Sequence, residues 1–450
     1  MSMKSVNPAT GQVLQEYPVL GDADLEAVLE RAVSTQKEIA ELSVGHRTEW
    51  LLQAADRLRA RREELAHLMT AEMGKTFASA LAEVDKCGWV CRYYSENGAS
   101  FLSDEVVESG ARESRIRYEP LGVVLAIMPW NFPLWQVFRF AAPALVAGNA
   151  GLLKHASNVP GCSLAIESVF AEAGFPPGAF QSLLIPAGRA EALVADHRIA
   201  AVTLTGSEPA GRAVARAAGQ SLKKSVLELG GSDPFIVLAD ADLEAAVETA
   251  VQARIINNGQ SCIAAKRFIV SEEIAEDFET RFIGRMEALK TGDPMDPSTD
   301  VGPLATEAIR AELHEQVTAS VAAGAHLSVG GVLPTGPGFF YPPTVLTDVP
   351  LRCPAAVEEL FGPVAPVFRA GSAAEALDLA NATDFGLGAS VWTRDDELVT
   401  LFVEGLQAGS VFVNGMVASD PRLPFGGIKR SGYGRELGVF GLREFLNIKT

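Results

Sequence analysis

A chain of 450 residues exceeds what one hydrophobic core usually serves, so we expect two or three domains. The formal net charge of −18, without any basic run, excludes nucleic acid as an expected partner. No apolar run approaches the roughly 18 residues of a membrane span, and the first residues lack the apolar stretch of a signal peptide. The sequence therefore predicts a cytoplasmic protein with no membrane partner.

The first part of the chain predicts helices. Apolar residues recur at helical spacing from Leu25 to Val33, after a possible cap at Asp22, and further helices are expected over 48–73 and 77–101. Gly74 is a plausible stop between the last two.

From Leu121 onward, short apolar runs alternate with amphipathic stretches that end in glycine. This alternation indicates βαβ units and a parallel sheet. The runs are LGVVLAIM (121–128), NAGLLKH (149–155), FQSLLIP (180–186), IAAVTLT (199–205), SVLEL (225–229) and PFIVLA (234–239).

A second α/β series follows Cys262. It predicts helices over 272–290 and 304–323, and strands over 388–393 and 409–413. Two α/β domains are the natural division.

The five cysteines are odd in number and scattered, at 87, 91, 162, 262 and 353. This is not a disulfide framework, so we expect reduced thiols. Cys87 and Cys91 lie one helical turn apart, but no other Cys or His stands at ligand spacing, and no metal site is expected.

Two glycine-containing segments are candidates for a dinucleotide-binding turn. The G-x-G-x-x-G fingerprint is absent, and its nearest relic, Gly432-Tyr433-Gly434, follows a loop. The strand 199–205 instead runs into Gly206 and Ser207 at the start of a helix, where free N–H groups can bind pyrophosphate. The same residues can simply begin a helix.

Five motifs follow one another in a diagnostic order. They are PWNFP (129–133), ELGG (228–231), NNGQSC (257–262), EELFGP (358–363) and PFGGIKRSGYG (424–434). Over essentially the whole chain, this set resembles the aldehyde dehydrogenase superfamily. The segments KHASNVPGC (154–162) and SDPRLPFGG (419–427) look most like those of bacterial succinate-semialdehyde dehydrogenases.

The resemblance implies an α/β fold with three parts. They are a Rossmann-like cofactor-binding domain (1–101 and 120–229), an α/β catalytic domain (230–440) and a small β bridging element (102–119 and 441–450). In this superfamily the bridging element pairs subunits, so a homodimer or a homotetramer is expected.

Three residues occupy the superfamily's catalytic positions. Cys262 follows a polar, turn-forming run rather than a core pattern, and by resemblance it is the nucleophile that captures a small-molecule aldehyde. Asn131 and the Cys262 N–H would stabilise the oxyanion, each by roughly 3 kcal/mol. Glu228 would activate the water that releases a carboxylic acid. Relatives that transfer the acyl group to coenzyme A do not need this glutamate.

The cofactor contacts also follow from the resemblance. They are Trp130, Lys154, Ser157, Gly206, Ser207, Glu359 and Phe361. Where many NAD-dependent relatives carry a glutamate that holds the ribose hydroxyls, this chain has Ser157. A carboxylate would repel a 2′-phosphate, whereas a hydroxyl beside Lys154 can donate to it. NADP is therefore expected, with NAD possible.

A semialdehyde with a remote carboxylate needs a cation in the pocket. Arg139 lies about two helical turns after Asn131 and is the first candidate, with a structural ion pair as its alternative role. Ser261 and Ser419 could add hydroxyl contacts, and Arg422 is the second choice of cation.

Two function classes compete with this interpretation. A cysteine hydrolase would need a histidine to activate the thiol, and none stands in a recognised context within fifty residues before Cys262. A catalytically silent binding protein is disfavoured by the intact set of Cys262, Glu228 and Asn131. Another semialdehyde or an aliphatic aldehyde remains an alternative substrate.

Overall fold

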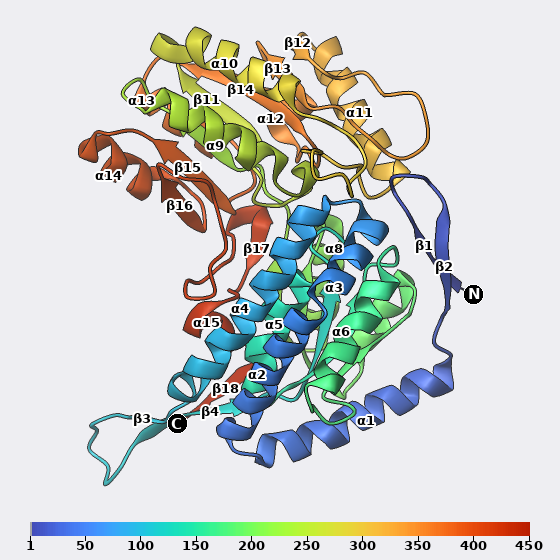
Figure 1. Cartoon of the computed structure of the whole chain (residues 1–450). Helices are drawn as coiled ribbons and strands as arrows, with labels where there is room; N and C mark the ends of the chain where they lie inside the picture. Colours follow the sequence, from blue (N-terminus) through green and yellow to red (C-terminus); the bar gives the residue numbers. More distant parts are fainter. Residues whose placement is uncertain (1) are drawn as a thin grey trace.

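The computed structural model describes residues 2–450, which build two α/β units and a small third sheet (Figure 1). The chain begins with an antiparallel hairpin of β1 (Ser2–Val6) and β2 (Val13–Pro18). Four helices follow, namely α1 (Asp22–Glu41), α2 (Val44–Ala60), α3 (Arg62–Met73) and α4 (Phe77–Phe101).

These first helices largely match the expectation. The helix over 77–101 is confirmed, and Gly74 ends α3 in the left-handed conformation at φ 83°. The region 48–73 is two helices divided at Arg61, and the first helix is capped by Gly21 rather than Asp22, whose carboxylate pairs with Arg189.

The first unit is built on a sheet with the strand order β17-β9-β8-β5-β6-β7, parallel except for β17. Its elements are β5 (Val123–Met128), α5 (Trp135–Val146), β6 (Ala150–His155), α6 (Pro160–Glu172), β7 (Phe180–Ser182), α7 (Ala190–Ala195), β8 (Ile199–Thr205), α8 (Glu208–Gln220), β9 (Lys224–Glu228) and β17 (Gly432–Tyr433).

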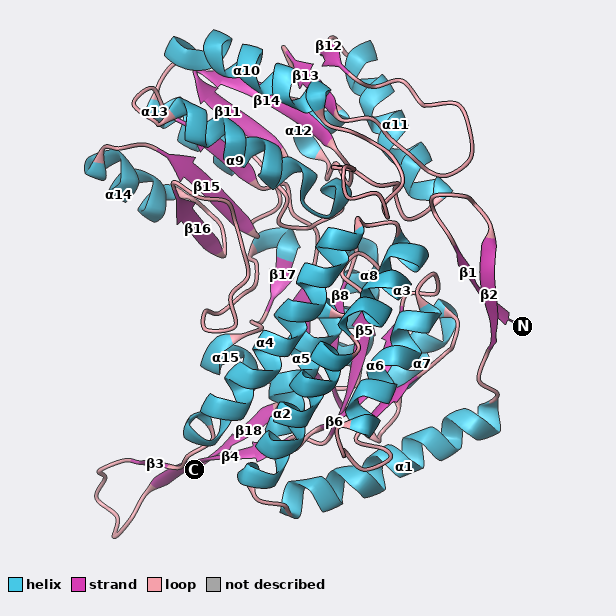
Figure 2. Ribbon diagram, viewed as in Figure 1, coloured by secondary structure: helices cyan, strands magenta, loops and turns pink. Residues whose placement is uncertain are grey.

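Both faces of this sheet are covered, as the continuous apolar strands predict. Along β5, Val124 and Ala126 join the core under α2 to α6, whereas Val123 and Leu125 join the core under α1 and α8. Figure 2 shows the helices on both sides of the strands.

The second unit has a seven-stranded sheet of order β12-β13-β14-β11-β10-β15-β16, parallel except for β12. Its elements are β10 (Pro234–Val237), α9 (Leu243–Ile255), β11 (Arg267–Ser271), α10 (Ala275–Ala288), α11 (Glu307–Ala322), β12 (His326–Val329), β13 (Thr344–Thr347), α12 (Pro354–Val357), β14 (Val364–Ala370), α13 (Ala373–Asn381), β15 (Gly388–Trp392), α14 (Asp396–Gly405) and β16 (Ser410–Val413).

The third sheet joins distant parts of the chain, with β18 (Leu446–Lys449) and β3 (Glu105–Val106) on either side of β4 (Arg115–Pro120). In Figure 1 the β3–β4 hairpin projects from the body of the molecule beside the C-terminus. These strands lie within the segments 102–119 and 441–450 that we expect to form the bridging element, apart from Pro120.

One part of the expected domain division needs correction. The range 230–440 was grouped with the catalytic domain, but β17 pairs with β9 in the first sheet, and α15 (Gly438–Arg443) packs against α5. After β16 the chain therefore returns to the first unit, because the edge of β9 is open to an antiparallel partner.

Within residues 2–450, no helix combines the length and apolarity that crossing a bilayer requires. The same residues contain no group of three or more His, Cys, Asp or Glu side chains that could hold a metal ion.

Candidate active site

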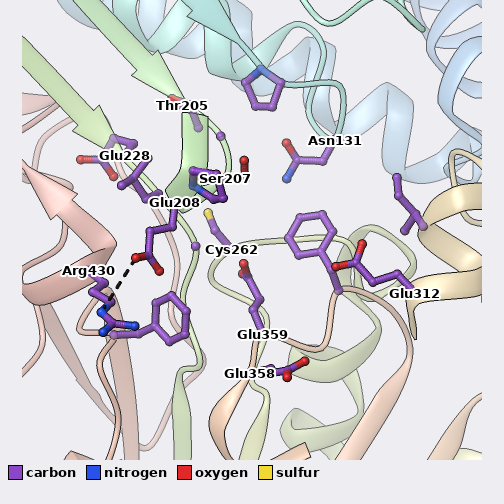
Figure 3. A pocket seen from close by; sticks show the side chains of 18 of the residues that line it. Asn131, Thr205, Ser207, Glu208, Glu228, Cys262, Glu312, Glu358, Glu359 and Arg430 are labelled. Carbon is purple, nitrogen blue, oxygen red and sulfur yellow. Dashed lines mark ion pairs between the residues drawn. The ribbon is translucent and has the colours of Figure 1, made fainter. Parts of the chain in front are cut away.

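A cavity of about 610 Å³ lies where the two units meet, at the carboxyl ends of β5, β8 and β9. In an open parallel sheet this edge is the usual place for a ligand. Figure 3 shows Asn131, Glu228 and Cys262 among the residues that line the cavity. The structure thus brings the three predicted catalytic residues together from segments far apart in the sequence.

The turn that carries Cys262 is built from buried amides. Asn257 and Asn258 both adopt left-handed backbone conformations, at φ 57° and 59°. The Asn257 side chain donates to the backbone carbonyls of Asn131 and Gln260, at 2.7 and 3.0 Å. The polar run before Cys262 therefore ties the nucleophile turn to the segment that carries Asn131.

Lys266 holds the same turn from the other side. Its completely buried ammonium donates to the carbonyls of Ser261 and Cys262 at 2.8 Å and lies 3.4 Å from the Glu359 carboxylate. The sequence analysis does not single out this residue, since a lysine four positions after a cysteine carries no signal of its own.

Burial raises the pKa of the Cys262 thiol to about 12, while the positive charges of Arg139 and Lys266 act in the opposite direction. The side chain is partly exposed to the cavity, whereas the other four cysteines are buried. Cys262 is therefore an accessible thiol, protonated at neutral pH, that must lose its proton before it can attack.

Asn131 presents its amide beside the nucleophile. Its Nδ2 donates to the Gln260 carbonyl at 3.1 Å, and its Oδ1 has no hydrogen-bond partner in the described chain. The Asn131 side chain is buried and held in place, so its amide is a preorganised hydrogen-bond donor.

Glu228 ends β9 as a buried carboxyl group whose oxygens both lack hydrogen-bond partners within residues 2–450. Burial and the nearby Glu436 raise its pKa well above the ordinary value, against the opposing charge of Arg139. A Cβ at Gly426 would lie 2.7 Å from Glu228 Oε1, so this glycine leaves room for the carboxyl group. Once such a group has lost its proton, it is a stronger base than an exposed glutamate.

The residues around the cavity suit a nicotinamide dinucleotide. Gly206 and Ser207 line it at the N-terminus of α8, where N–H groups are free to meet phosphate. Trp130 and Phe361 meet edge to face on its wall, with ring centroids 5.7 Å apart.

Glu359 completes that wall by accepting a hydrogen bond from the Gly231 N–H at 3.0 Å. A Cβ at Gly230 would meet Glu359 Oε2, so a larger residue there would displace the end of the Glu359 side chain.

Lys154 and Ser157 lie outside the lining of the cavity. Lys154 is buried near the end of β6, beside β5, and Ser157 is exposed in the turn that follows. Both therefore lie at the same edge of the sheet as the cavity, one strand further along.

The predicted substrate contacts are only partly brought to the site. Arg139 is fully buried, forms an ion pair with Glu436, donates to Thr205 Oγ1 at 3.4 Å and does not line the cavity. Glu436 is thus the ion-pair partner that the alternative role of Arg139 requires. Glu436 lies two residues after the last recognised motif, and no sequence signal singled it out.

The other three candidate substrate contacts do not line the cavity either. Ser261 is buried and does not line the cavity, and Arg422 is bound to Asp420 on the surface. Ser419 is nearly buried and accepts a hydrogen bond from Lys86 at 2.8 Å.

Comparison with known proteins identifies the family of the chain. The model of the aldehyde dehydrogenase family matches residues 1–450. A probable NADP-dependent succinate-semialdehyde dehydrogenase of Synechocystis is 56% identical over 450 residues, which cover 100% of this chain and 99% of the relative. An NADP-dependent succinate-semialdehyde dehydrogenase of Mycobacterium tuberculosis is 54% identical, with coverage of 100% and 99%.

Solved structures show the same relationship. Succinic semialdehyde dehydrogenase of Streptococcus pyogenes, in complex with NADP⁺, has a TM-score of 0.97 and 36% identity over 99% of this chain and 98% of that one. Betaine aldehyde dehydrogenase of Staphylococcus aureus, in complex with NAD⁺, has a TM-score of 0.96 and 30% identity, with coverage of 100% and 90%. This chain thus shares the fold of these two solved structures, and it belongs to the aldehyde dehydrogenase family.

Proposed function

We propose that this enzyme oxidises succinate semialdehyde to succinate with NADP as the electron acceptor. The observation that carries the proposal is the full-length likeness, at 56% and 54% identity, to two bacterial relatives whose names specify this reaction and this cofactor. The cavity with Cys262, Asn131 and Glu228 supplies the chemistry that such a reaction needs.

The first step belongs to Cys262. Its thiolate attacks the aldehyde carbon and gives a tetrahedral adduct, whose oxyanion is held by Asn131 Nδ2 and the Cys262 N–H. The charges of Arg139 and Lys266 favour the thiolate that this step needs. The cofactor, when bound, accepts the hydride that leaves the adduct carbon.

The second step belongs to Glu228. Its carboxylate takes a proton from water, whose oxygen attacks the thioester carbon, and the carbon–sulfur bond breaks to release the acid and Cys262. The presence of Glu228 favours water as the acyl acceptor, because relatives that transfer the acyl group to coenzyme A do not need this glutamate. A cysteine hydrolase is disfavoured, since no histidine of residues 2–450 lines the cavity.

The cofactor preference rests on Ser157 and Lys154. Ser157 brings no negative charge to the turn after β6, and the Lys154 ammonium lies at the end of the same strand. A 2′-phosphate at this edge of the sheet would meet a cation and a hydroxyl donor.

The proposal includes a homo-oligomer and a cytoplasmic location. The projecting sheet of β3, β4 and β18 exposes Val106 and Ile448, which suits a pairing surface in a homodimer or in a tetramer of dimers. All five cysteines are free, which suits the reducing cytoplasm.

A steady-state panel tests the function. It would compare succinate semialdehyde, glutarate semialdehyde and uncharged butanal, each with NADP and NAD. We expect the largest kcat/KM for succinate semialdehyde with NADP. A larger value for butanal, or for glutarate semialdehyde, would replace the proposed substrate and leave the cysteine chemistry intact.

A further inference from the structure

Lys266 is a fully buried cation behind the turn that carries the nucleophile. Its ammonium donates to the backbone carbonyls of Ser261 and Cys262, both at 2.8 Å, and to that of Ala264 at 3.1 Å. A neutral amine has only two N–H groups, so three carbonyl acceptors require the charged form. The whole donor capacity of this ammonium is therefore spent on the backbone of one short segment, 261–264.

The contact with Ser261 fixes the peptide unit that carries the Cys262 N–H. The peptide bond between the two residues is trans, so its carbonyl and its N–H point in opposite directions. Lys266 holds the carbonyl from the protein interior and does not line the cavity, whereas Cys262 does. The Cys262 N–H donates to no acceptor within residues 2–450. It is therefore a free donor that points away from Lys266, toward the side of the turn on which the cavity lies.

The Asn131 amide reaches the neighbouring peptide. Its Nδ2 donates to the carbonyl of Gln260 at 3.1 Å, one residue before the carbonyl that Lys266 holds. The two expected oxyanion donors, Asn131 Nδ2 and the Cys262 N–H, are thus both placed by hydrogen bonds to this short stretch of backbone.

Glu359 supplies the counter-charge. Its carboxylate lies 3.4 Å from Lys266 Nζ, and it lines the cavity together with Cys262, as Figure 3 shows. Burial lowers the pKa of the Lys266 ammonium, and Glu359 is the foremost of the charges that act in the opposite direction. The carboxylate therefore favours the protonated form of a lysine that has no contact with water.

We propose that Lys266 is a positioning residue, which orients and polarises the Ser261–Cys262 peptide so that the Cys262 N–H stabilises the oxyanion. The inference rests on the proposed function, because this oxyanion forms only when the thiolate adds to an aldehyde or water adds to the thioester. An ammonium on the carbonyl oxygen draws electron density from the amide, which makes the N–H a stronger donor. No bond to Lys266 forms or breaks in either step.

Lys266→Met tests the assignment through two rates at the same cysteine. Oxidation of succinate semialdehyde forms an oxyanion, whereas alkylation by iodoacetamide displaces iodide from a saturated carbon and forms none. We expect first-turnover NADPH formation to slow about ten- to hundredfold more than alkylation, since deletion of an oxyanion donor costs about a hundred- to thousandfold. The alkylation rate carries any effect of the Lys266 charge on the thiol pKa, so the ratio of the two losses isolates the oxyanion.

Arg267→Met is the matched control. Arg267 is also a buried cation, and its guanidinium donates to the carbonyls of Ser232, Leu379 and Ala380 at 3.0, 2.7 and 2.7 Å, outside the nucleophile turn. We expect its loss to lower the melting temperature, as the loss of Lys266 does, but to change the two rates in equal proportion.

A second variant, Lys266→Gln, is neutral but keeps two N–H donors for the buried carbonyls, so it carries the test if Lys266→Met does not fold. We expect the same excess loss of NADPH formation over alkylation, smaller than with methionine.

The outcomes separate the two proposals. A wild-type enzyme that forms no NADPH from succinate semialdehyde would show that the proposed function itself is wrong. If the wild type does form NADPH, but substitution of Lys266 slows NADPH formation and alkylation equally, or Arg267→Met shows the same excess loss, the positioning role of Lys266 is refuted.

Discussion

Lys75 and Glu83 form a completely buried ion pair beneath the start of α5, and the same Glu83 carboxylate caps the Leu134 and Trp135 N–H groups. The Lys75 ammonium also lies 4.3 Å from the centre of the Phe132 ring. Lys75 and Glu83 therefore both contact the segment that begins with Asn131, Lys75 at Phe132 and Glu83 at the start of α5.

These contacts predict that Glu83 positions Asn131. Glu83→Gln keeps an acceptor for the α5 N–H groups but leaves the Lys75 charge buried and unpaired, which costs about 3 to 5 kcal/mol of stability. We expect a lower melting temperature and a kcat reduced about tenfold, with unchanged NADP affinity. In an Asn131→Ala background the further loss of kcat should be small, since both changes then act through one group. Fully additive losses would refute this coupling.

A second prediction concerns Glu228. Glu228→Gln should slow hydrolysis of the thioester more than hydride transfer, because glutamine cannot take the proton from water. Rapid mixing with succinate semialdehyde and NADP should show a burst of NADPH followed by a slow steady rate. Equal slowing of the two phases would show that Glu228 acts before the thioester forms.

Cofactor preference can be inverted at Ser157. Ser157→Glu places a carboxylate beside the expected 2′-phosphate, and the KM for NADP should rise about ten- to hundredfold. NAD should bind better, because the new carboxylate can accept from both ribose hydroxyls. A wild-type preference for NAD of about tenfold or more would contradict the cofactor assignment and leave the catalytic one standing.

The raised pKa of Cys262 predicts the reactivity of the enzyme without its cofactor. Since that pKa is about 12, the thiolate fraction should grow about tenfold with each pH unit between pH 7 and 9. The rate of alkylation by iodoacetamide, followed by loss of activity, should rise in the same proportion. Mass spectrometry should locate one label per chain, at Cys262, and a plateau below pH 8 would mean that the cavity activates the thiol beforehand.

The sequence predicted the parallel sheets and the catalytic residues for different reasons. The short apolar runs at 121–128 and 199–205 alternate with amphipathic stretches, a pattern that indicated strands of a parallel sheet, and they contain β5 and β8. Cys262, Asn131 and Glu228 were identified by the resemblance of their motifs, because nothing in the local pattern of Glu228 separates a base from a solvated glutamate.

What escaped prediction depends on partners far away in the sequence. The charge of Arg139 was visible, but its neutralisation by Glu436 arises only because residues 432–443 return to the first unit. Lys86 and Ser419 are 333 positions apart, and no local signal joins them. Gly432 and Tyr433 were grouped with the wrong unit because a two-residue strand is too short to leave a periodic pattern.

The pairing of β17 with β9 also has a consequence for synthesis of the protein. Gly432 pairs with Glu228, and Glu436, four residues later, sets the charge around that carboxyl group. The base thus acquires its surroundings only when almost the entire chain has left the ribosome. A nascent or C-terminally truncated chain can already carry Cys262, but it lacks the strand and the acidic partner beside Glu228, so we expect catalysis to begin only when the last segment docks.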